Sequence, residues 1–350
     1  MKLDGLLASI RSEFGIVENE IVVYRSHECL CQHSSLGFFP HHFIYSASKL
    51  TTMTAMMQAC EMGLIGLDDP VSRYLEEYDD VLVLEAGHLR PPKNPMTIRH
   101  LASMQARLSY DVRSKSLLDC IKAGHTDTRS IIRALAREPL HFDPGMGYEY
   151  SLAHDVIACI IEVASGIPFD QFCQSRIFDR LSMNSTGFKT YDDMAQQYQM
   201  VDGMIERLEG NEFIFGPDYI SGGAGVVTTS LDYIKLADAL SCKDPQILKA
   251  SSIDAMRTNQ LSPETRRIYQ SKHTEARKDY SYALGVRTHV ARTNSLSSIG
   301  EFGWDGAAGA YVLCDPELEL SIYYSEDLRF CPSNGSVIHP MIRDAVYRSL

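Results

Sequence analysis

Strand patterns occupy the two ends of this chain, and helical patterns fill the long stretch between them. Near the C-terminus, Leu320, Ile322 and Tyr324 alternate with other side chains, which is typical of a half-buried strand. Near the N-terminus, residues 20–32 are rich in β-branched residues and alternate in polarity, which predicts another strand. Strands at both ends with helices between them predict an α/β (α+β) fold, in which an antiparallel sheet flanked by helices is built from both chain ends and carries a mainly helical insertion.

Shorter patterns supply the remaining elements. Residues 38–45 are expected to be extended, and residues 310–314 to form a hairpin with the C-terminal strand. Asp69 and Pro70 are expected to cap and open a helix. Apolar residues spaced three or four apart predict further helices over residues 3–14, from 46 to a stop at Gly63, over 151–165 with Gly166 as its left-handed end, from 230, and over 337–348.

Two of these helices carry a specific expectation about burial. The helix after residue 46 is apolar or small almost all round, so it is predicted to be buried. The last helix is expected to bury Val337, Met341, Ile342 and Ala345. We divide the chain into a sheet subdomain, residues 1–70 with 278–350, and a mainly helical subdomain, residues 71–277, with the active site at their interface.

Composition excludes several classes of function. The net charge of −12 and the absence of a basic cluster give no electrostatic basis for binding nucleic acid or an anionic membrane. No apolar run reaches the roughly 18 residues of a membrane span, and the first residues lack a secretory signal pattern, which predicts a cytoplasmic protein. The nine cysteines are interpreted as reduced, mostly core residues. The twelve histidines show no metal-ligand spacing, so neither a metal site nor a cofactor is predicted.

Ser46 and Lys49 form an S-x-x-K pattern at the start of a predicted helix. Side chains at positions i and i+3 share one helix face, so the hydroxyl and the amine would meet. A desolvated lysine has a lowered pKa and can accept a proton from a serine nucleophile. The alternative is a helix-capping serine beside a lysine whose amine reaches solvent, and spacing alone does not distinguish the two.

The surrounding residues supply a resemblance. Further motifs follow in order at residues 43–52, 63–71, 144–151, 160–169, 181–188, 222–229 and 303–309. This set resembles the class C β-lactamase and penicillin-binding protein family of serine hydrolases over roughly residues 38–325. The resemblance implies the fold already described, no cofactor, and a small-molecule acyl substrate; it does not indicate an oligomeric state.

The resemblance also implies roles for individual residues. Ser46 would attack a carbonyl, and Lys49 and Tyr150 would take and return its proton. Without the motif, Tyr150 would be interpreted as an aromatic packed on the core. The backbone N–H groups of Ser46 and of Ala307, on an edge strand, would hold the oxyanion. Leu152, Trp304, Asp305 and Gly306 would contact the substrate. The glycine run at 222–225 lacks a phosphate-binding pattern and is interpreted as a tight turn.

Three departures from the family pattern affect the predicted substrate. Leu152 stands where the family has asparagine, and Trp304 where it has lysine or histidine. Residues 104–108 replace its His-Thr-Ser-Gly-Leu stretch. The lost cation argues against penicillin or cephalosporin hydrolysis, and favours a small ester or related acyl substrate. A D-amino-acid peptidase or amidase, a β-lactamase, and a non-catalytic binding relative remain the alternatives.

Overall fold

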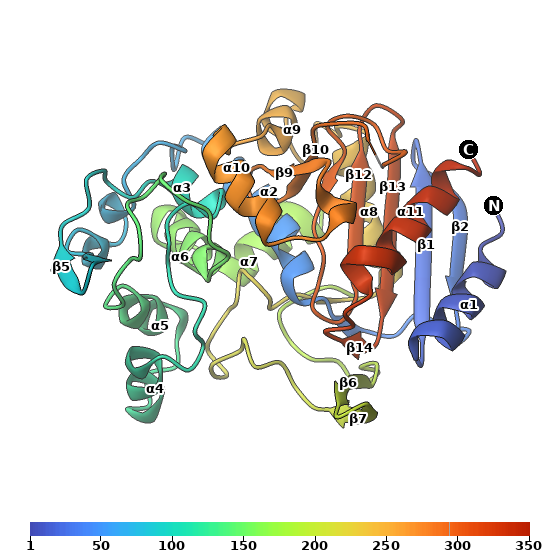
Figure 1. The fold of residues 1–350 in the computed structure, drawn as a ribbon, viewed down its shortest axis with the longest axis horizontal. Coiled ribbons are helices and arrows are strands. Elements are labelled where there is room, and N and C mark those ends of the chain that lie inside the picture. The colour runs from blue at the N-terminus through green and yellow to red at the C-terminus, as the bar shows by residue number, and fades with distance from the viewer. Residues whose placement is uncertain (294) are drawn as a thin grey trace.

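Seven strands form one antiparallel sheet in the computed structural model, which describes residues 1–293 and 295–350 (Figure 1). Their spatial order is β2 (Glu28–Ser34), β1 (Asn19–Arg25), β13 (Leu320–Glu326), β12 (Tyr311–Asp315), β11 (Phe302–Gly303), β10 (Arg287–His289) and β9 (Tyr280–Tyr282). The N-terminal β1 pairs with the C-terminal β13, with Val22 opposite Tyr323 at the middle. The predicted fold class, with a sheet built from both chain ends, is therefore confirmed. The boundaries drawn between its two subdomains stay a prediction.

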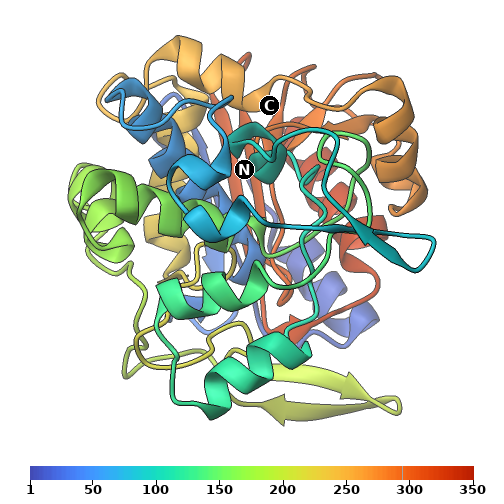
Figure 2. The same ribbon diagram turned by 90° about the vertical axis from the view of Figure 1, so that its left-hand side faces the viewer.

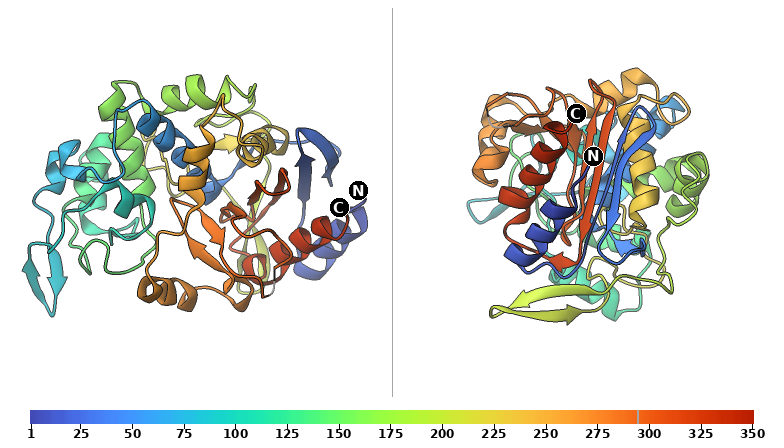
Figure 3. Two further views of the ribbon diagram at one scale, coloured as in Figure 1. Left: turned by 90° about the horizontal axis from the view of Figure 1, so that it is seen from above. Right: turned by 90° about the vertical axis from the view of Figure 1, so that its right-hand side faces the viewer.

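Helices cover both faces of this sheet, as the right-hand view of Figure 3 shows. On one face, α1 (Asp4–Phe14) and α11 (His339–Tyr347) pack their apolar side chains on Ile322 and its neighbours. On the other face, α8 (Ser230–Ser241) and α2 (Ser48–Glu61) pack on a core that includes Tyr323. All seven residues of β13 are buried, so its predicted half-buried character was wrong. Alternate side chains of β13 do point to opposite faces of the sheet, but helices cover both of these faces.

The remaining helices lie at the left and the centre of Figure 1. They are α3 (Ile98–Ala102), α4 (Lys115–Lys122), α5 (Thr128–Leu135), α6 (Ala153–Ser165), α7 (Phe169–Cys173), α9 (Ala250–Arg257) and α10 (Pro263–Ser271). Gly166 follows α6 in the left-handed conformation, as predicted. Among the described residues, no single helix is long and apolar enough to cross a membrane.

Short strands pair outside the main sheet. β3 (His42–Phe43) pairs with β8 (Val227–Thr228), β4 (Val83–Glu85) with β5 (His88–Arg90), and β6 (Gln197–Val201) with β7 (Met204–Leu208) and β14 (Leu328–Arg329). The β6–β7 hairpin projects from the body of the molecule (Figure 2). The β4–β5 and β6–β7 hairpins were not predicted from the sequence, and only His42 and Phe43 of the extended segment predicted over 38–45 form a strand.

Three further expectations were wrong for identifiable reasons. The strand predicted over residues 20–32 is the β1–β2 hairpin, because Ser26 and His27 both adopt positive φ and turn the chain. Asp69 does not cap a helix: its carboxylate accepts hydrogen bonds from the Gly66 N–H and the Tyr74 hydroxyl.

The third concerns the start of the last helix. Val337 is exposed because the chain forms a wider π turn over Asn334–Ile338 before α11, which changes the helical phase. Within α11, Ile342 and Val346 are the residues that reach the core. Met341 and Ala345 are partly buried.

Candidate active site

Ser46 lies on a strained turn that joins β3 to α2. The turn is a short 3-10 segment, Tyr45–Ala47, and Tyr45 has a φ of 46°, in the left-handed region that non-glycine residues rarely adopt. The Tyr45 hydroxyl donates to the Gln197 side chain at 2.5 Å, and the ring meets Phe213 edge-on. These contacts hold Tyr45 in place, so Ser46 is presented, partly exposed, at the start of the helix.

Lys49 meets Ser46, one helical turn earlier, inside the protein. Its amine donates to the Ser46 hydroxyl at 3.1 Å and to the carbonyl of Gly223 at 2.8 Å. The side chain is only 2% exposed, so the amine does not reach solvent, and α2 has no side-chain cap. Burial lowers the pKa of Lys49 below its usual value, although Tyr110 and Asp155 act in the opposite direction. The geometry therefore contradicts the capping-serine interpretation, and it suits an amine that accepts a proton.

Tyr150 lies over the same amine. The Lys49 nitrogen is 4.8 Å from the centre of the Tyr150 ring, and the Trp304 indole N–H donates to the Tyr150 hydroxyl at 3.0 Å. The two rings stack with centres 5.7 Å apart. Burial raises the pKa of Tyr150 above its usual value, and interactions with Ser46 and Trp304 only partly offset this. The phenol is therefore protonated at neutral pH, ready to donate a proton.

Residues 304–309, which belong to the third motif, lie near Ser46. Gly306 and Ala307 lie in a tight turn between β11 and β12, closed by a hydrogen bond of 2.7 Å from the Gly306 N–H to the Ala310 carbonyl. The expectation that Ala307 lies on an edge strand was wrong, because the edges of the sheet are β2 and β9. The turn packs near the chain before Ser46, since Ala307 contacts the cluster that contains Tyr45.

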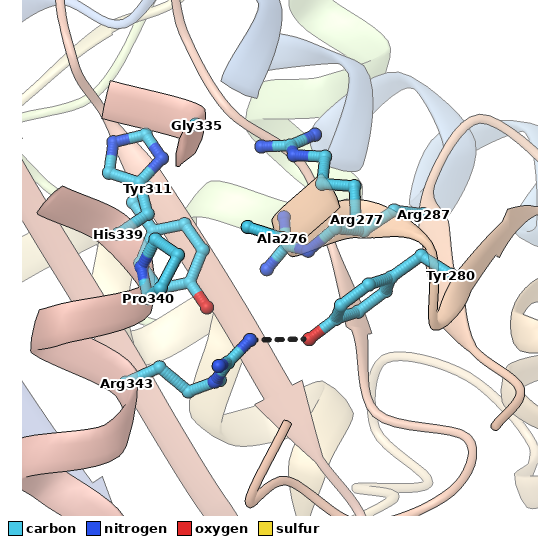
Figure 4. Close-up of a pocket in the computed structure, with 9 residues that line it drawn as sticks. All are labelled: Ala276, Arg277, Tyr280, Arg287, Tyr311, Gly335, His339, Pro340 and Arg343. Atoms are coloured by element: carbon cyan, nitrogen blue, oxygen red, sulfur yellow. Dashed lines mark hydrogen bonds between the residues drawn. The ribbon is translucent and has the colours of Figure 1, made fainter. Parts of the chain in front are cut away.

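Asp305 points away into a group of arginines. Its carboxylate pairs with Arg287 at 2.8 Å and, in close contact, with Arg277. Both arginines line the small pocket in Figure 4, with His339 and Arg343 on its other side. Two guanidinium groups thus occupy the Asp305 carboxylate, and its predicted contact with the substrate stays a prediction.

The residues of this site lie within a stretch that matches a known protein family. A family model described as Beta-lactamase matches residues 41–325. The chain belongs to the beta-lactamase family. With that assignment the predicted resemblance, and with it the prediction of a serine hydrolase, is confirmed. The match spans the S-x-x-K pair, Tyr150 and the third motif.

Individual relatives of this beta-lactamase family member are named as esterases and acyltransferases. Esterase EstB from Burkholderia gladioli is 26% identical over 86% of this chain and 81% of its own length. Acyltransferase calJ from Penicillium decumbens is 29% identical over 81% of this chain and 74% of its own length. Among solved structures, EstCE1, described as a hydrolase with promiscuous acyltransferase activity, superposes with a TM-score of 0.83 at 24% identity, covering 99% of this chain and 97% of its own.

Asp155 is a buried carboxylate near Lys49 that the sequence analysis did not select. It is the third residue of α6, in the first turn, and accepts hydrogen bonds from the hydroxyls of Tyr219 at 2.9 Å and Ser221 at 2.7 Å. These bonds hold the glycine run against α6: a Cβ on Gly223 would meet an Asp155 oxygen at 2.6 Å. The glycine run is therefore more than a tight turn, because it brings the Gly223 carbonyl to Lys49. Asp155 thus acts on Lys49 through its charge and through the Gly223 backbone that it holds.

Replacing Asp155 with asparagine should move the acidic limb of the kcat/KM–pH profile to lower pH. The Asp155 carboxylate favours the charged form of Lys49, so its removal lowers the pKa of Lys49 further. Neutral amine then becomes available at lower pH, and activity rises earlier as pH increases.

The control for this prediction is Asp143→Asn, which removes a buried carboxylate whose partner is Arg90. Its profile should keep the wild-type midpoint. An unchanged midpoint in Asp155→Asn, or a shift to higher pH, would contradict the placement of this carboxylate in the electrostatic environment of Lys49.

Gly306→Ala should lower both stability and turnover. A Cβ at this position would lie 2.3 Å from the Ile44 carbonyl oxygen, a backbone atom that cannot move alone. We expect a loss of about 1–3 kcal/mol in the free energy of unfolding, as for other overpacked sites, and a lower kcat because the turn must shift away from Ser46. Urea denaturation and ester kinetics measure the two effects. Gly5→Ala, where nothing lies within 4 Å of the added Cβ, is the matched substitution; it lies in α1, where alanine favours the helix, so it should lower neither stability nor turnover.

Leu152 and Tyr110 complete the surroundings of the site. Leu152 is buried in the main core at the start of α6, so its predicted contact with the substrate stays a prediction. Tyr110, which the sequence analysis missed, meets the Tyr150 ring edge-on at 5.2 Å and interacts with the Ser46 hydroxyl. It also lines a cavity of about 170 Å³ with Arg107 and Glu149. No motif pointed to Tyr110, which lies just after residues 104–108, the stretch that departs from the family pattern.

Proposed function

We propose that this protein is an ester hydrolase that works through an acyl-enzyme on Ser46. The observation that carries the proposal is the bond of 3.1 Å between the Lys49 amine and the Ser46 hydroxyl, in a place where burial lowers the pKa of the lysine. A buried amine with a lowered pKa is neutral over more of the pH range, and a neutral amine accepts the hydroxyl proton as serine attacks.

The pKa of Lys49 is lowered and that of Tyr150 is raised, so each residue is suited to a different proton transfer. Lys49 takes the proton from Ser46 as the carbonyl is attacked. Tyr150, whose raised pKa keeps it protonated, donates to the departing alkoxide. The proton then returns from Lys49 to Tyr150, whose ring centre lies 4.8 Å from the Lys49 nitrogen. The backbone N–H groups of Ser46 and Ala307 stabilise the oxyanion, and water cleaves the acyl-enzyme by the reverse set of transfers.

The substrate is proposed to be a small, weakly charged ester or related acyl compound. Trp304 is 6% exposed, and its indole N–H is bonded to Tyr150, so this position offers an apolar surface in place of a cation. Relatives named as esterases and acyltransferases support an acyl substrate. The predicted cytoplasmic location and the lack of nucleic-acid and membrane partners stay predictions.

Hydrolysis of two chromogenic substrates tests the proposal. Purified protein should cleave a short-chain p-nitrophenyl ester and leave a chromogenic cephalosporin almost untouched. Efficient cephalosporin cleavage would make the protein a β-lactamase and show that Trp304 does not exclude a substrate carboxylate. Cleavage of D-amino-acid amides in preference to esters would favour the peptidase or amidase alternative. If neither substrate is cleaved and no acyl adduct forms on Ser46 in mass spectrometry, the non-catalytic alternative stands.

A further inference from the structure

Three potential metal ligands meet where the β1–β2 turn crosses the C-terminal end of α8. The His27 Nδ1 lies 2.7 Å from one carboxylate oxygen of Asp238, and the Cys242 sulfur lies 3.7 Å from the other. The nitrogen, oxygen and sulfur atoms all lie within 4.8 Å of one another. Figure 3, right-hand view, shows α8 beside the β1–β2 hairpin, on the sheet face opposite α1 and α11.

The fold holds these three side chains together from two elements. Asp238 and Cys242 are four residues apart at the end of α8, so they share one helix face. His27 reaches them from the turn, where its φ of 68° directs the chain over α8. The His27 backbone N–H also lies within hydrogen-bonding reach of the Cys242 sulfur. The Asp238 carboxylate is buried and Cys242 is partly buried, while the exposed His27 ring is held at the cluster by its contact with Asp238.

We propose that His27, Asp238 and Cys242 bind one zinc-type divalent cation, which fastens the edge hairpin of the sheet to α8. Imidazole nitrogen, carboxylate oxygen and thiolate sulfur are the donors that zinc takes in proteins, and three donors with a solvent molecule complete a tetrahedron. Ligand atoms around tetrahedral zinc lie about 3.3–3.8 Å apart, from bond lengths of about 2.0–2.3 Å. The three atoms, which lie within 4.8 Å of one another, are close to this spacing.

The local charge is suited to a cation. Asp238 is 6% exposed, and Glu319 adds a further carboxylate close to Cys242. Among the residues that the structure describes, the only group in contact with the Asp238 carboxylate that can carry a positive charge is the His27 imidazole, which does so only when protonated. On binding, the thiol loses its proton to the buffer and the imidazole binds through an unprotonated Nδ1, while the Asp238 carboxylate keeps its charge.

Sequence spacing gave no sign of this site. His27 and Asp238 are 211 positions apart, and the pattern Asp238-x-x-x-Cys242 alone is too common to indicate a ligand pair. The expectation of no metal site rested on local motifs, which cannot detect ligands that the fold brings together. Cys29 stands opposite Tyr24 on the strand that follows the turn, and it is not one of the three residues whose ligand atoms come together.

Cobalt(II) binding tests the site without reference to catalysis. Metal-free protein, kept reduced, should bind one equivalent of Co²⁺ with a thiolate-to-cobalt charge-transfer band, and Zn²⁺ should displace it. Cys242→Ser should abolish the band, and His27→Ala should weaken cobalt binding by about 10-fold or more. Zinc should also raise the unfolding temperature of wild type and leave that of Cys242→Ser unchanged.

His33→Ala is the matched control. His33 pairs with Asp4 at 2.8 Å, a similar histidine–aspartate pair that has no sulfur ligand, so its loss should leave the cobalt spectrum intact. A wild-type protein with no charge-transfer band would overturn the proposal. So would a band that survives in Cys242→Ser and disappears in Cys29→Ser, because the ligating sulfur would then lie elsewhere.

Discussion

Ser46→Ala should reduce kcat/KM for a p-nitrophenyl ester by about 1000-fold or more and leave the fold intact. The hydroxyl is the atom that would carry the acyl group, and no other group can replace it at the end of the strained Tyr45–Ala47 turn. The stability cost should be below about 1 kcal/mol, because Lys49 keeps its bond to the Gly223 carbonyl when the Ser46 acceptor is lost. Steady-state kinetics and thermal unfolding measure the two quantities.

Ser48→Ala provides the comparison for this result. Ser48 lies two residues further along, is buried, and its hydroxyl accepts a hydrogen bond from the Val226 N–H at 3.1 Å. Its loss should cost some stability while turnover stays within a few-fold of wild type. Turnover retained in Ser46→Ala would remove Ser46 as the nucleophile. In wild type alone, a slow ester should leave an acyl adduct on the peptide that contains Ser46, detectable by mass spectrometry.

Tyr150→Phe should slow ester hydrolysis by about 100-fold or more, the usual cost of losing a positioned proton donor. The ring would remain stacked on Trp304 and in contact with Lys49, so the change removes the hydroxyl and little packing. If Lys49 is the base, the acidic limb of the kcat/KM–pH profile should keep its midpoint in Tyr150→Phe. A midpoint that moves with this substitution would assign the limb to the phenol.

Substrates with different leaving groups make the Tyr150 prediction sharper. A p-nitrophenolate leaves without protonation, whereas an alkoxide needs a proton from the protein. The loss in Tyr150→Phe should therefore be larger for alkyl esters than for p-nitrophenyl esters. Equal losses for both would place Tyr150 in the attack step rather than in the departure step. Trp304→Phe removes the hydrogen bond of 3.0 Å to Tyr150 together with part of a buried ring, leaves the Tyr150 hydroxyl in place, and should cost less activity than Tyr150→Phe.

Local patterns predicted the parts of the site that depend on neighbours in sequence. Ser46 and Lys49 meet because three residues along a helix bring side chains to one face, and that requires no knowledge of the rest of the chain. Tyr150 and Trp304 came from their place in an ordered set of motifs. Asp155 was missed because its importance depends on Tyr219, Ser221 and Gly223, which lie more than 60 positions later.

The errors in the predicted fold have similar causes. The β6–β7 hairpin turns at Asp202 and Gly203, an Asp-Gly pair with positive φ that favours a tight hairpin, so the signal was present and overlooked. Ser26 and His27 form an equivalent turn without glycine, so the local sequence carries no recognisable turn signal. β13 was expected to face solvent on one side, but helices from distant parts of the chain cover both faces.

The strained conformation of Tyr45, the residue before the nucleophile, depends on contacts from the segment that contains the β6–β7 hairpin. A non-glycine residue held at such a φ costs about 1–3 kcal/mol, which the surrounding contacts must offset. Here they come from Gln197, at the start of β6, and from Phe213, beyond β7. Substitutions in the 197–213 segment can therefore relax the turn before Ser46 and change turnover without touching a substrate. This segment is where selection could exchange stability for activity, and where an engineered library would find faster or more robust variants.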